Sequence, residues 1–201
     1  LLNSLYKGDI EFTENGIKSI SVSINPPELF LMPLETIFKQ IHSDKSRPFI
    51  KYNPGKRREN IYRLYSESKS RDGRNIPYMN KAQIFKLIKS IGTKKSISVY
   101  QNIVYNSNEF VFMYEILTNG TVIVRLETNK ALSINDCSEL IKETANPFLS
   151  DVQSIVDSRG YSVGRIENLY SDNVDIININ YVMKTQLIKK INLKKYINCV
   201  S

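Results

Sequence analysis

Groups that could carry out acid–base or nucleophilic chemistry are few in this sequence. It has one histidine, His42, and two cysteines, Cys137 and Cys199, which are far apart in the chain. A catalytic site needs several such groups held together by the fold. His42 follows a predicted helix, where an interaction with the helix C-terminus explains it better than catalysis. Carboxylate pairs such as Asp9 with Glu11 and Asp172 with Asp175 could hold a metal in a nuclease-like site, but solvated turn residues explain them better.

Nucleotide-binding and hydrolase motifs are also missing. The stretch NPGKR at 53–57 has a Gly-Lys pair but lacks the earlier glycine and the following Ser or Thr of a P-loop. There is no dinucleotide fingerprint and no G-x-S-x-G sequence. We therefore expect no catalytic residues, no metal site and no cofactor. A metal-dependent nuclease remains an alternative that would need carboxylates clustered beside the basic residues.

The chemistry of a binding surface is better represented. Residues 51–74, KYNPGKRRENIYRLYSESKSRDGR, combine cations with tyrosines, and this combination can neutralise phosphates while packing against sugars or bases. The predicted nucleic-acid contacts are Lys51, Tyr52, Lys56, Arg57, Arg58, Arg63, Lys69, Arg71 and Arg74, together with Lys94 and Lys95. A solvated basic loop and ordinary strand packing of the tyrosines are the alternatives.

Positive charge is concentrated in the same region. The net charge is +8, and residues 39–95 contain sixteen of the 28 Lys and Arg but only four of the 20 Asp and Glu. This region therefore carries about +12 and the remainder about −4. Release of counterions favours contact between such a region and a phosphate backbone, with strong dependence on salt.

Length, hydropathy and cysteine content indicate the domain number and the cellular compartment. A chain of 201 residues can bury one sizeable core. No apolar run reaches the roughly 20 residues of a membrane span, and the two cysteines suggest neither disulfides nor zinc. We expect a soluble protein in a reducing, intracellular compartment. The first residue is not Met and the chain stops within LIKKINLKKYINCVS, so we expect a single domain, residues 1–201, excised from a larger chain.

The first half of the chain predicts strands and one helix. DIEFTENGIKSISVSIN predicts a hairpin that turns at Asn15-Gly16. A helix is expected from Pro33, and a turn at 53–55 precedes a strand at 60–65. The apolar stripe of the helix is Leu34, Ile37, Phe38 and Ile41.

The second half completes an α+β domain. We expect a helix at 80–92, a strand at 95–106, a hairpin at Asn119-Gly120, a helix opened by Ser133 and Asp136, strands within 161–185 and a final basic helix. The long helix is expected to pause at Asn146-Pro147. Together the elements predict a mostly antiparallel sheet with helices packed on one face.

Both faces of the predicted hairpin at Asn119-Gly120 carry apolar residues. We expect Val111, Met113, Leu117, Val122, Val124 and Leu126 to form the core face. Helices of this chain could cover the second face, or the shallow groove of a nucleic acid could do so. In the second case the sheet-face contacts are Ser21, Ser23, Asn25, Phe110, Phe112, Tyr114, Arg125, Asn178 and Asn180.

Short similar strands indicate an internal repeat. KSISVSIN at 18–25 nearly coincides with KSISVYQN at 95–102, and DIININYV at 175–182 has the same alternation. A repeat that starts near 18 and again near 95 or 175 is therefore a hypothesis.

The order of these elements resembles a known fold. The strand SISVSIN, the helix LETIFKQIHSD, the phrase IKYNPGKRRENIYRLY, a hairpin, a long helix and the strand IININYV resemble one repeat of the TATA-binding protein fold with the opening of the next. The local likeness is YNP followed by basic residues and a strand. The chain departs from that family by a helix inserted at about 79–92 and by an incomplete second repeat.

Residues 39–100 also resemble large proteins of nucleocytoplasmic large DNA viruses, in particular the large subunit of their early transcription factor. This resemblance implies a noncatalytic DNA-binding domain of a viral transcription initiation factor. It also implies double-stranded promoter DNA, a helicase-like small subunit and the viral RNA polymerase as partners, in the cytoplasmic viral factory or the virion. The alternative is a protein-interaction or scaffold module of a viral polymerase or virion assembly, whose basic face meets an acidic partner.

Overall fold

The computed structural model describes residues 12–26, 31–56, 58–65, 89, 93–159 and 174–185. This part of the chain forms seven strands and two helices with defined bounds. In chain order they are β1 Phe12–Ile24, α2 Leu34–Gln40, β2 Phe49–Asn53, β3 Ile61–Leu64, β4 Ser96–Tyr105, β5 Asn108–Leu117, β6 Val122–Leu132, α4 Ile134–Ser158 and β7 Val174–Thr185.

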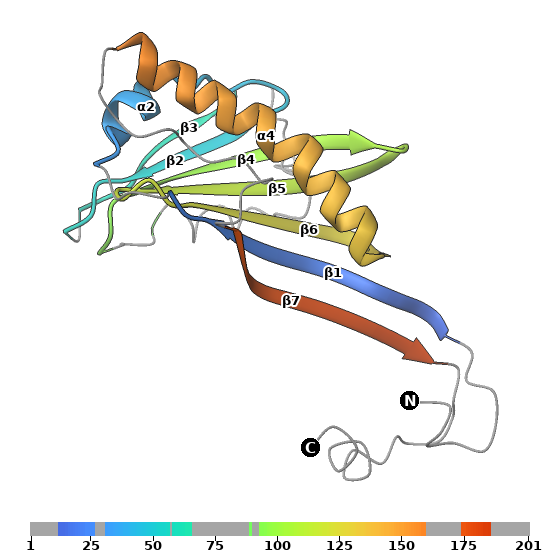
Figure 1. The fold of residues 1–201 in the computed structure, drawn as a ribbon. Helices are drawn as coiled ribbons and strands as arrows, with labels where there is room; N and C mark the ends of the chain where they lie inside the picture. Colours follow the sequence, from blue (N-terminus) through green and yellow to red (C-terminus); the bar gives the residue numbers. More distant parts are fainter. Residues whose placement is uncertain are drawn as a thin grey trace, which may run out of the picture.

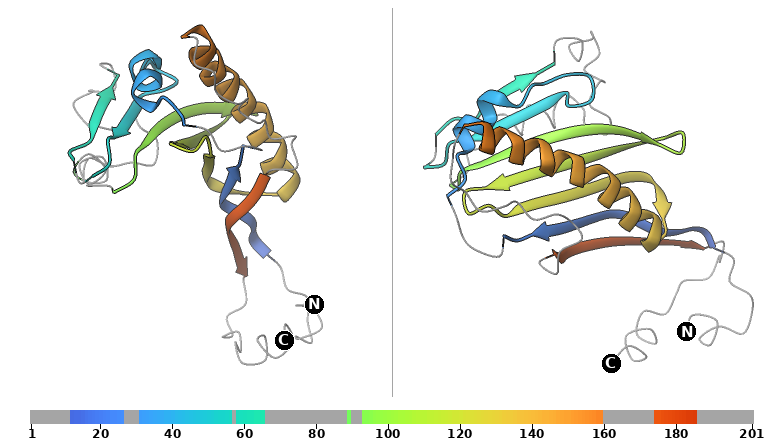
Figure 2. Two further views of the ribbon diagram at one scale, coloured as in Figure 1. Left: turned by 60° about the vertical axis from the view of Figure 1, so that its left-hand side comes forward. Right: turned by 45° about the horizontal axis from the view of Figure 1, so that its top comes forward.

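The strands form one sheet in the order β3-β2-β4-β5-β6-β1-β7. Every described pair of neighbouring strands is antiparallel. Helices α2 and α4 lie on the same face of the sheet, and α4 crosses the strands diagonally (Figure 1, Figure 2). The predicted α+β class, with an antiparallel sheet and helices on one face, is therefore confirmed.

Strand β1 corrects the predicted hairpin at Asn15-Gly16. The strand runs through both residues without a turn, and Gly16 is opposite Val182 of β7. Gly16 has a φ of 148°, and a Cβ placed on it would lie 2.6 Å from the carbonyl oxygen of Leu132 in β6. Glycine is required here because a neighbouring backbone approaches closely, which a local turn signal does not reveal.

The hairpin between β5 and β6 is confirmed, but its loop has three residues. The Leu117 carbonyl accepts a hydrogen bond from the Gly120 N–H (3.2 Å), and the Leu117 N–H donates to the carbonyl of Thr121 (2.9 Å). Gly120 has a φ of 85°, the left-handed conformation found in the last residue of such loops. Ile116 is therefore opposite Val122.

The three-residue loop changes which residues share a face. Residues directly opposite each other point to the same side of a sheet, and Tyr114 is opposite Val124 while Met113 is opposite Arg125. Val111 and Met113 therefore lie on the face opposite to Val122 and its neighbours. The prediction that they belong to one core face is wrong, because a loop longer by one residue reverses the alternation of one strand relative to the other.

The main core lies between the sheet and the two helices. The ring of Tyr114 stacks on Phe148 of α4 with the ring centroids 3.9 Å apart, and its hydroxyl donates to the Thr144 carbonyl at 3.4 Å. Burial raises the pKa of Tyr114 well above its ordinary value. The predicted stripe of α2 is confirmed as part of this core and consists of Leu34, Ile37, Phe38 and Ile41.

Helix α4 begins as predicted but does not pause. The Ser133 hydroxyl accepts from the Asp136 N–H (3.1 Å) and donates to the Asp136 carboxylate (2.7 Å). The helix continues through Pro147 to Ser158, because buried residues on both sides of the proline hold it on the sheet. Within the described residues, no helix is both long and apolar enough to cross a membrane.

Several predicted elements lie outside the described residues. They are the helix at 80–92, apart from residue 89, the strands between 161 and 173, and the final basic helix. The predicted turn at 53–55 and the strand at 60–65 are confirmed, the latter as β3.

Replacing Phe148 by alanine is expected to lower the free energy of unfolding by about 3–5 kcal/mol, because it removes the ring that stacks on Tyr114 and leaves a cavity. Ile134→Ala is a matched control on the same helix, since Ile134 is 52% exposed, and should cost at most about 0.5 kcal/mol. Urea unfolding followed by circular dichroism measures both. Similar losses of unfolding free energy in the two variants would contradict the packing of α4 against the sheet through Phe148.

Candidate nucleic-acid interface

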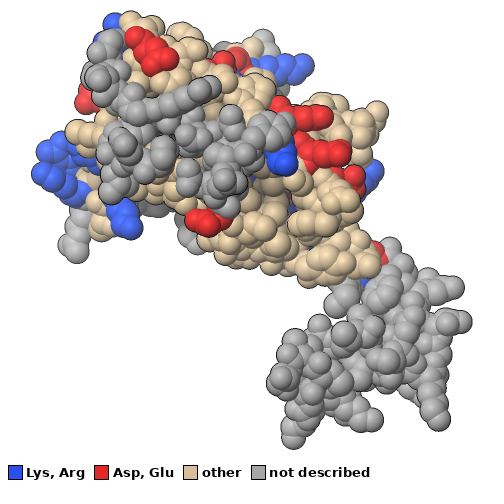
Figure 3. Space-filling model, in the orientation of Figure 1, with Lys and Arg blue, Asp and Glu red and all other residues tan. Residues whose placement is uncertain are grey.

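Four of the predicted phosphate contacts meet at one end of the sheet. Lys56 and Arg58 lie in the loop between β2 and β3, and Lys94 and Lys95 lie just before β4. Since β2 and β4 are neighbours, the two segments lie side by side. All four residues are exposed, and Lys and Arg atoms gather at the left-hand end in Figure 3, where Figure 1 shows the β2–β3 loop. We call these four residues the basic end.

The loop after β2 is held against the segment before β4. The Asn53 side-chain oxygen accepts from the Gly55 N–H at 2.9 Å, and the Lys56 N–H donates to the Thr93 carbonyl at 3.3 Å. Gly55 and Lys56 have φ values of 72° and 52°. A side chain on Gly55 would be strained, because glycine alone adopts positive φ without steric cost. These backbone contacts set the relative positions of the cations.

The cations of the basic end form no ion pairs with the rest of the described structure. Among the described residues, no carboxylate forms an ion pair with any of these four cations. The nearby Glu35 bonds to Lys39 at 2.7 Å. That hydrogen bond is the main cause of the lowered pKa of Glu35, and the charge of Lys95 adds to it. The positive field of the basic end thus reaches α2.

Lys51, another predicted nucleic-acid contact, lies on β2 beside polar residues of the neighbouring strands. It is opposite Ser98 of β4, which in turn is opposite Glu115 of β5. Burial lowers the pKa of the half-buried Lys51, and the charge of Glu115 opposes this effect. Glu115 also pairs with Arg125 at 3.4 Å. Lys51 therefore belongs to a row of charges across the sheet rather than to the basic end.

Two further predicted contacts hold α2. Tyr52 is only 6% exposed, and its ring stacks on Phe38 with centroids 5.5 Å apart. Arg63 donates to the carbonyl oxygens of Lys39 (3.3 Å) and Ile41 (3.0 Å), and its guanidinium lies 4.7 Å from the Phe38 ring centroid. The prediction of Tyr52 as an exposed nucleic-acid contact is wrong because α2 covers it. Arg63 serves the C-terminal end of α2, where a cation is favourable.

Arg47, another cation of the basic region, binds α4, and no sequence pattern indicated this contact. Arg47 pairs with Asp151 of α4 at 2.5 Å and lies 5.6 Å from the Phe148 ring centroid. No sequence signal joins residues so far apart in the chain. The remaining predicted contacts, Arg57, Lys69, Arg71 and Arg74, lie outside the described residues.

Polar candidates gather on the sheet face turned away from α2 and α4, which we call the far face. Ser21 is opposite Arg125 of β6 and opposite Asn178 of β7, and Ser19 is opposite Asn180. The neighbours of these serines along β1 are Ile20 and Val22, whose side chains are buried on the helix side. The predicted row of Ser21, Ser23, Arg125, Asn178 and Asn180 therefore lies on one face.

Asn25 links the end of this row to β7. Its side-chain oxygen accepts from the Ser23 hydroxyl at 3.1 Å and its amide donates to Asp175 at 2.9 Å. The Thr121 hydroxyl also donates to it, at 3.4 Å. This bonding places Asn25 beside the row, and the sequence carried no signal for the contact with Asp175.

The aromatic candidates lie on the opposite side of the sheet. Phe110 is 2% exposed, and Phe112 and Tyr114 are 0% exposed, beneath the helices. Their prediction as groove contacts is wrong, because helices of the same chain cover them. The alternative stated for this face, coverage by helices, is confirmed.

The far face is exposed only in part. On the side of β2, β4 and β5, Phe49, Tyr100 and Val111 form a second buried cluster, and burial raises the pKa of Tyr100 to about 12. On the side of β6, β1 and β7, residues Arg125 and Asn178 are exposed, as is Asn180. This second part therefore presents exposed polar groups to a ligand.

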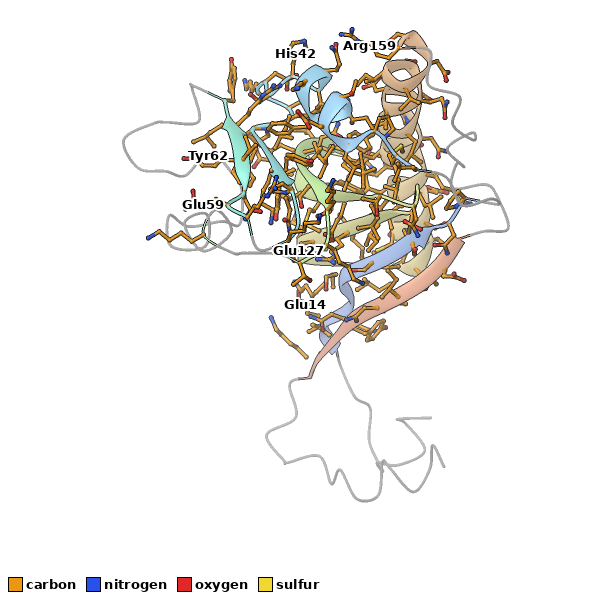
Figure 4. The ribbon with its side chains drawn as sticks, turned by 90° about the vertical axis from the view of Figure 1, so that its left-hand side faces the viewer. Glu14, His42, Glu59, Tyr62, Glu127 and Arg159 are labelled. Carbon is orange, nitrogen blue, oxygen red and sulfur yellow. The ribbon has the colours of Figure 1, made fainter. Side chains whose placement is uncertain are left out.

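The described residues offer no cluster suited to binding a metal. Within them no group of three or more His, Cys, Asp or Glu could hold a metal ion. His42 lies beside α2, apart from the labelled carboxylates Glu14, Glu59 and Glu127 (Figure 4). Cys137 is buried in the core, and burial raises its pKa to about 11, so its thiol is protonated and inaccessible at neutral pH.

Comparison with known proteins adds no relative: no family model, no curated protein and no solved structure matches the chain. The class that the structure defines is an α+β domain with a basic end and a partly exposed polar sheet face. Its function must be argued from these surfaces.

Arg63→Ala is expected to lower the free energy of unfolding by about 1–3 kcal/mol, because it removes charged hydrogen bonds to α2 and the contact with Phe38. Arg58→Ala, at an exposed position of the basic end, should change it by at most about 0.5 kcal/mol. Urea unfolding compares the two. If Arg63→Ala were as neutral as Arg58→Ala, the structural role of Arg63 would be refuted.

Proposed function

We propose that the chain is a noncatalytic DNA-binding domain of a viral transcription initiation factor, which contacts double-stranded promoter DNA. The observation that carries this proposal is the basic end. Cations from two separate segments, Lys56 with Arg58 and Lys94 with Lys95, are exposed together. Among the described residues none of the four has an acidic partner within ion-pair distance.

A cluster of unneutralised cations suits a phosphate backbone better than a small molecule. Each phosphate that it neutralises releases condensed counterions, which makes binding favourable at low salt and independent of sequence. The backbone contacts of the β2–β3 loop hold the cations in place without side-chain ion pairs. Such contacts position a protein on the duplex but do not specify bases.

The exposed part of the far face is suited to contacting sugars and base edges. Hydroxyl and amide groups on β1 and β7 can bond to sugars and base edges, and Arg125 can donate to either. The carboxylates of Glu127 and Asp175 lie on the same part of the sheet, and they limit how much negative charge it accepts. We therefore assign most of the affinity to the basic end and the finer contacts to the far face.

The order of elements supports a TATA-binding-protein-like interpretation. A strand, a short helix, further strands and a long helix are followed by β7, which pairs antiparallel with β1. In the resemblance, β7 opens the second repeat, so that the first strands of two repeats would lie side by side. The viral origin, the helicase-like small subunit and the viral RNA polymerase as partners, and a place in the viral factory or the virion are proposed on the resemblance alone.

A second candidate function is a protein-interaction or scaffold module of a viral assembly. It is favoured by the burial of Phe110, Phe112 and Tyr114, which removes the aromatic wedges that groove binding could use. The basic end would then meet an acidic protein segment. Tighter binding of an acidic peptide than of duplex DNA at the same salt would favour this function.

Replacing Lys56, Arg58, Lys94 and Lys95 together by alanine is expected to weaken duplex binding and flatten its dependence on salt. If all four contact phosphates, the slope of log K against log salt becomes less negative by about 3.6. Fluorescence anisotropy of a labelled duplex across a salt series measures this slope.

The matched control removes the same charge elsewhere, at Lys45, Lys130, Lys142 and Arg159. It should leave the slope close to that of the unmodified chain, because these residues lie outside the basic end. An equal change in both variants would show that net charge alone drives binding and would overturn the assignment of the basic end.

The double variant Ser21→Glu with Asn178→Glu tests the far face. Carboxylates on that face should weaken duplex binding by about tenfold or more, because like charges repel at close range. Ser138→Glu with Ser150→Glu adds the same charge at exposed positions of α4 and should have a much smaller effect. Equal losses would remove the far face from the proposed interface.

A further inference from the structure

Strand β7 presents an exposed apolar row at one edge of the sheet. Ile176, Ile179 and Tyr181 are 60%, 41% and 53% exposed. The β1 residues opposite them are Val22, Ile20 and Ile17, which are only 5%, 4% and 3% exposed. The cover that α4 provides therefore ends at β1. Ile177, the extra residue where the pairing of β7 with β1 shifts, is 54% exposed.

The outer edge of β7 is unprotected within the described structure. No described strand pairs with it, so the N–H and C=O groups of alternate residues, which do not bond to β1, are directed outward. Proteins usually protect such an edge with charges or proline, but the eight residues from Ile176 to Met183 contain neither. The opposite edge, β3, has only four residues, and short edge strands are less prone to pairing.

The two charged residues of β7 lie at opposite ends of this uncharged stretch. Asp175 is opposite Ser23 and accepts a hydrogen bond from Asn25, and Lys184 is opposite Glu14 and forms an ion pair with it, so a second copy would share these charges with their present partners. Because the shift in pairing at Ile177 adds one residue to β7, Asp175 comes onto the far face with Asn178 and Asn180. Lys184 shares that face by simple alternation from Asn180.

We propose that β7 pairs antiparallel with β7 of a second copy of this chain, about a two-fold axis at Asn180. In this register Ile179 lies against Tyr181 of the second copy on the helix side. With Ile177 left unpaired here as it is against β1, Asp175 comes opposite Lys184 of the second copy on the far face, and the same pair recurs at the other end. The interface is isologous, as in most symmetric dimers.

The positions of Asp175 and Lys184 favour antiparallel pairing of β7 with β7 of a second copy. Antiparallel pairing places a carboxylate opposite an ammonium at both ends, whereas parallel pairing would place like charges together. A single strand pair buries less than the roughly 1,200 Å² of a standard interface, so the dimer should be weak and concentration dependent. This inference rests on β7 alone and does not depend on DNA binding.

Charge exchange tests the register. Asp175→Lys alone and Lys184→Asp alone each put like charges opposite one another, and each should raise the dimer dissociation constant about tenfold. Mixing the two variants restores opposite charges at both ends, so a heterodimer should form as well as the original dimer does. Sedimentation velocity of the 201-residue chain over a dilution series measures all three.

An inward charge tests the apolar row. Ile179→Lys should abolish dimerisation, while Val104→Lys, at a position 72% exposed on β4, should leave it unchanged. Circular dichroism establishes that each variant is folded. A chain that stays monomeric at every concentration, single charge variants that dimerise normally, or a mixture that forms no heterodimer would overturn the proposal.

Discussion

The packing of α4 on one face of the sheet is the constraint on which the other features depend. The stacked rings of Tyr114 and Phe148, 3.9 Å apart, lie at the centre of this contact. Because the helix occupies that face, a ligand that contacts the sheet must approach its far face, its edges or its loops. The aromatic residues of β5 thereby become core, and the polar side chains of β1 and β7 become surface.

Contacts formed by the fold divide the cations of the basic region into two groups. Arg47 is bound to α4, Arg63 to the end of α2, and Lys51 is half-buried in a charge row with Glu115. The charges of these three residues stabilise the fold and are less accessible to a ligand. The basic end remains because its cations lie on loops whose positions are set by backbone contacts, and none of them forms an ion pair with another described residue.

The two proposed surfaces lie at different places in the strand order. The basic end belongs to the β2 and β4 side of the sheet, and β7 is the opposite edge. A dimer through β7 would extend one sheet across two copies and leave both basic ends accessible. The basic end and β7 therefore share no residue, whereas Asn178 and Asn180 of the far face lie on the strand that would pair in the dimer.

The sequence by itself determined what depends on local patterns: the α+β class, the apolar stripe of α2, the cap of α4 at Ser133, and the concentration of cations between residues 39 and 95. Tertiary structure decided the rest. Asn-Gly occurs twice, yet Asn119-Gly120 turns the chain while Asn15-Gly16 stays inside β1, because neighbouring strands on both sides outweigh a local turn preference. One loop residue likewise decided which face carries Tyr114. Contacts between residues distant in sequence, such as Arg47 with Asp151, decided which cations form ion pairs within the described structure. Local composition does not predict such contacts.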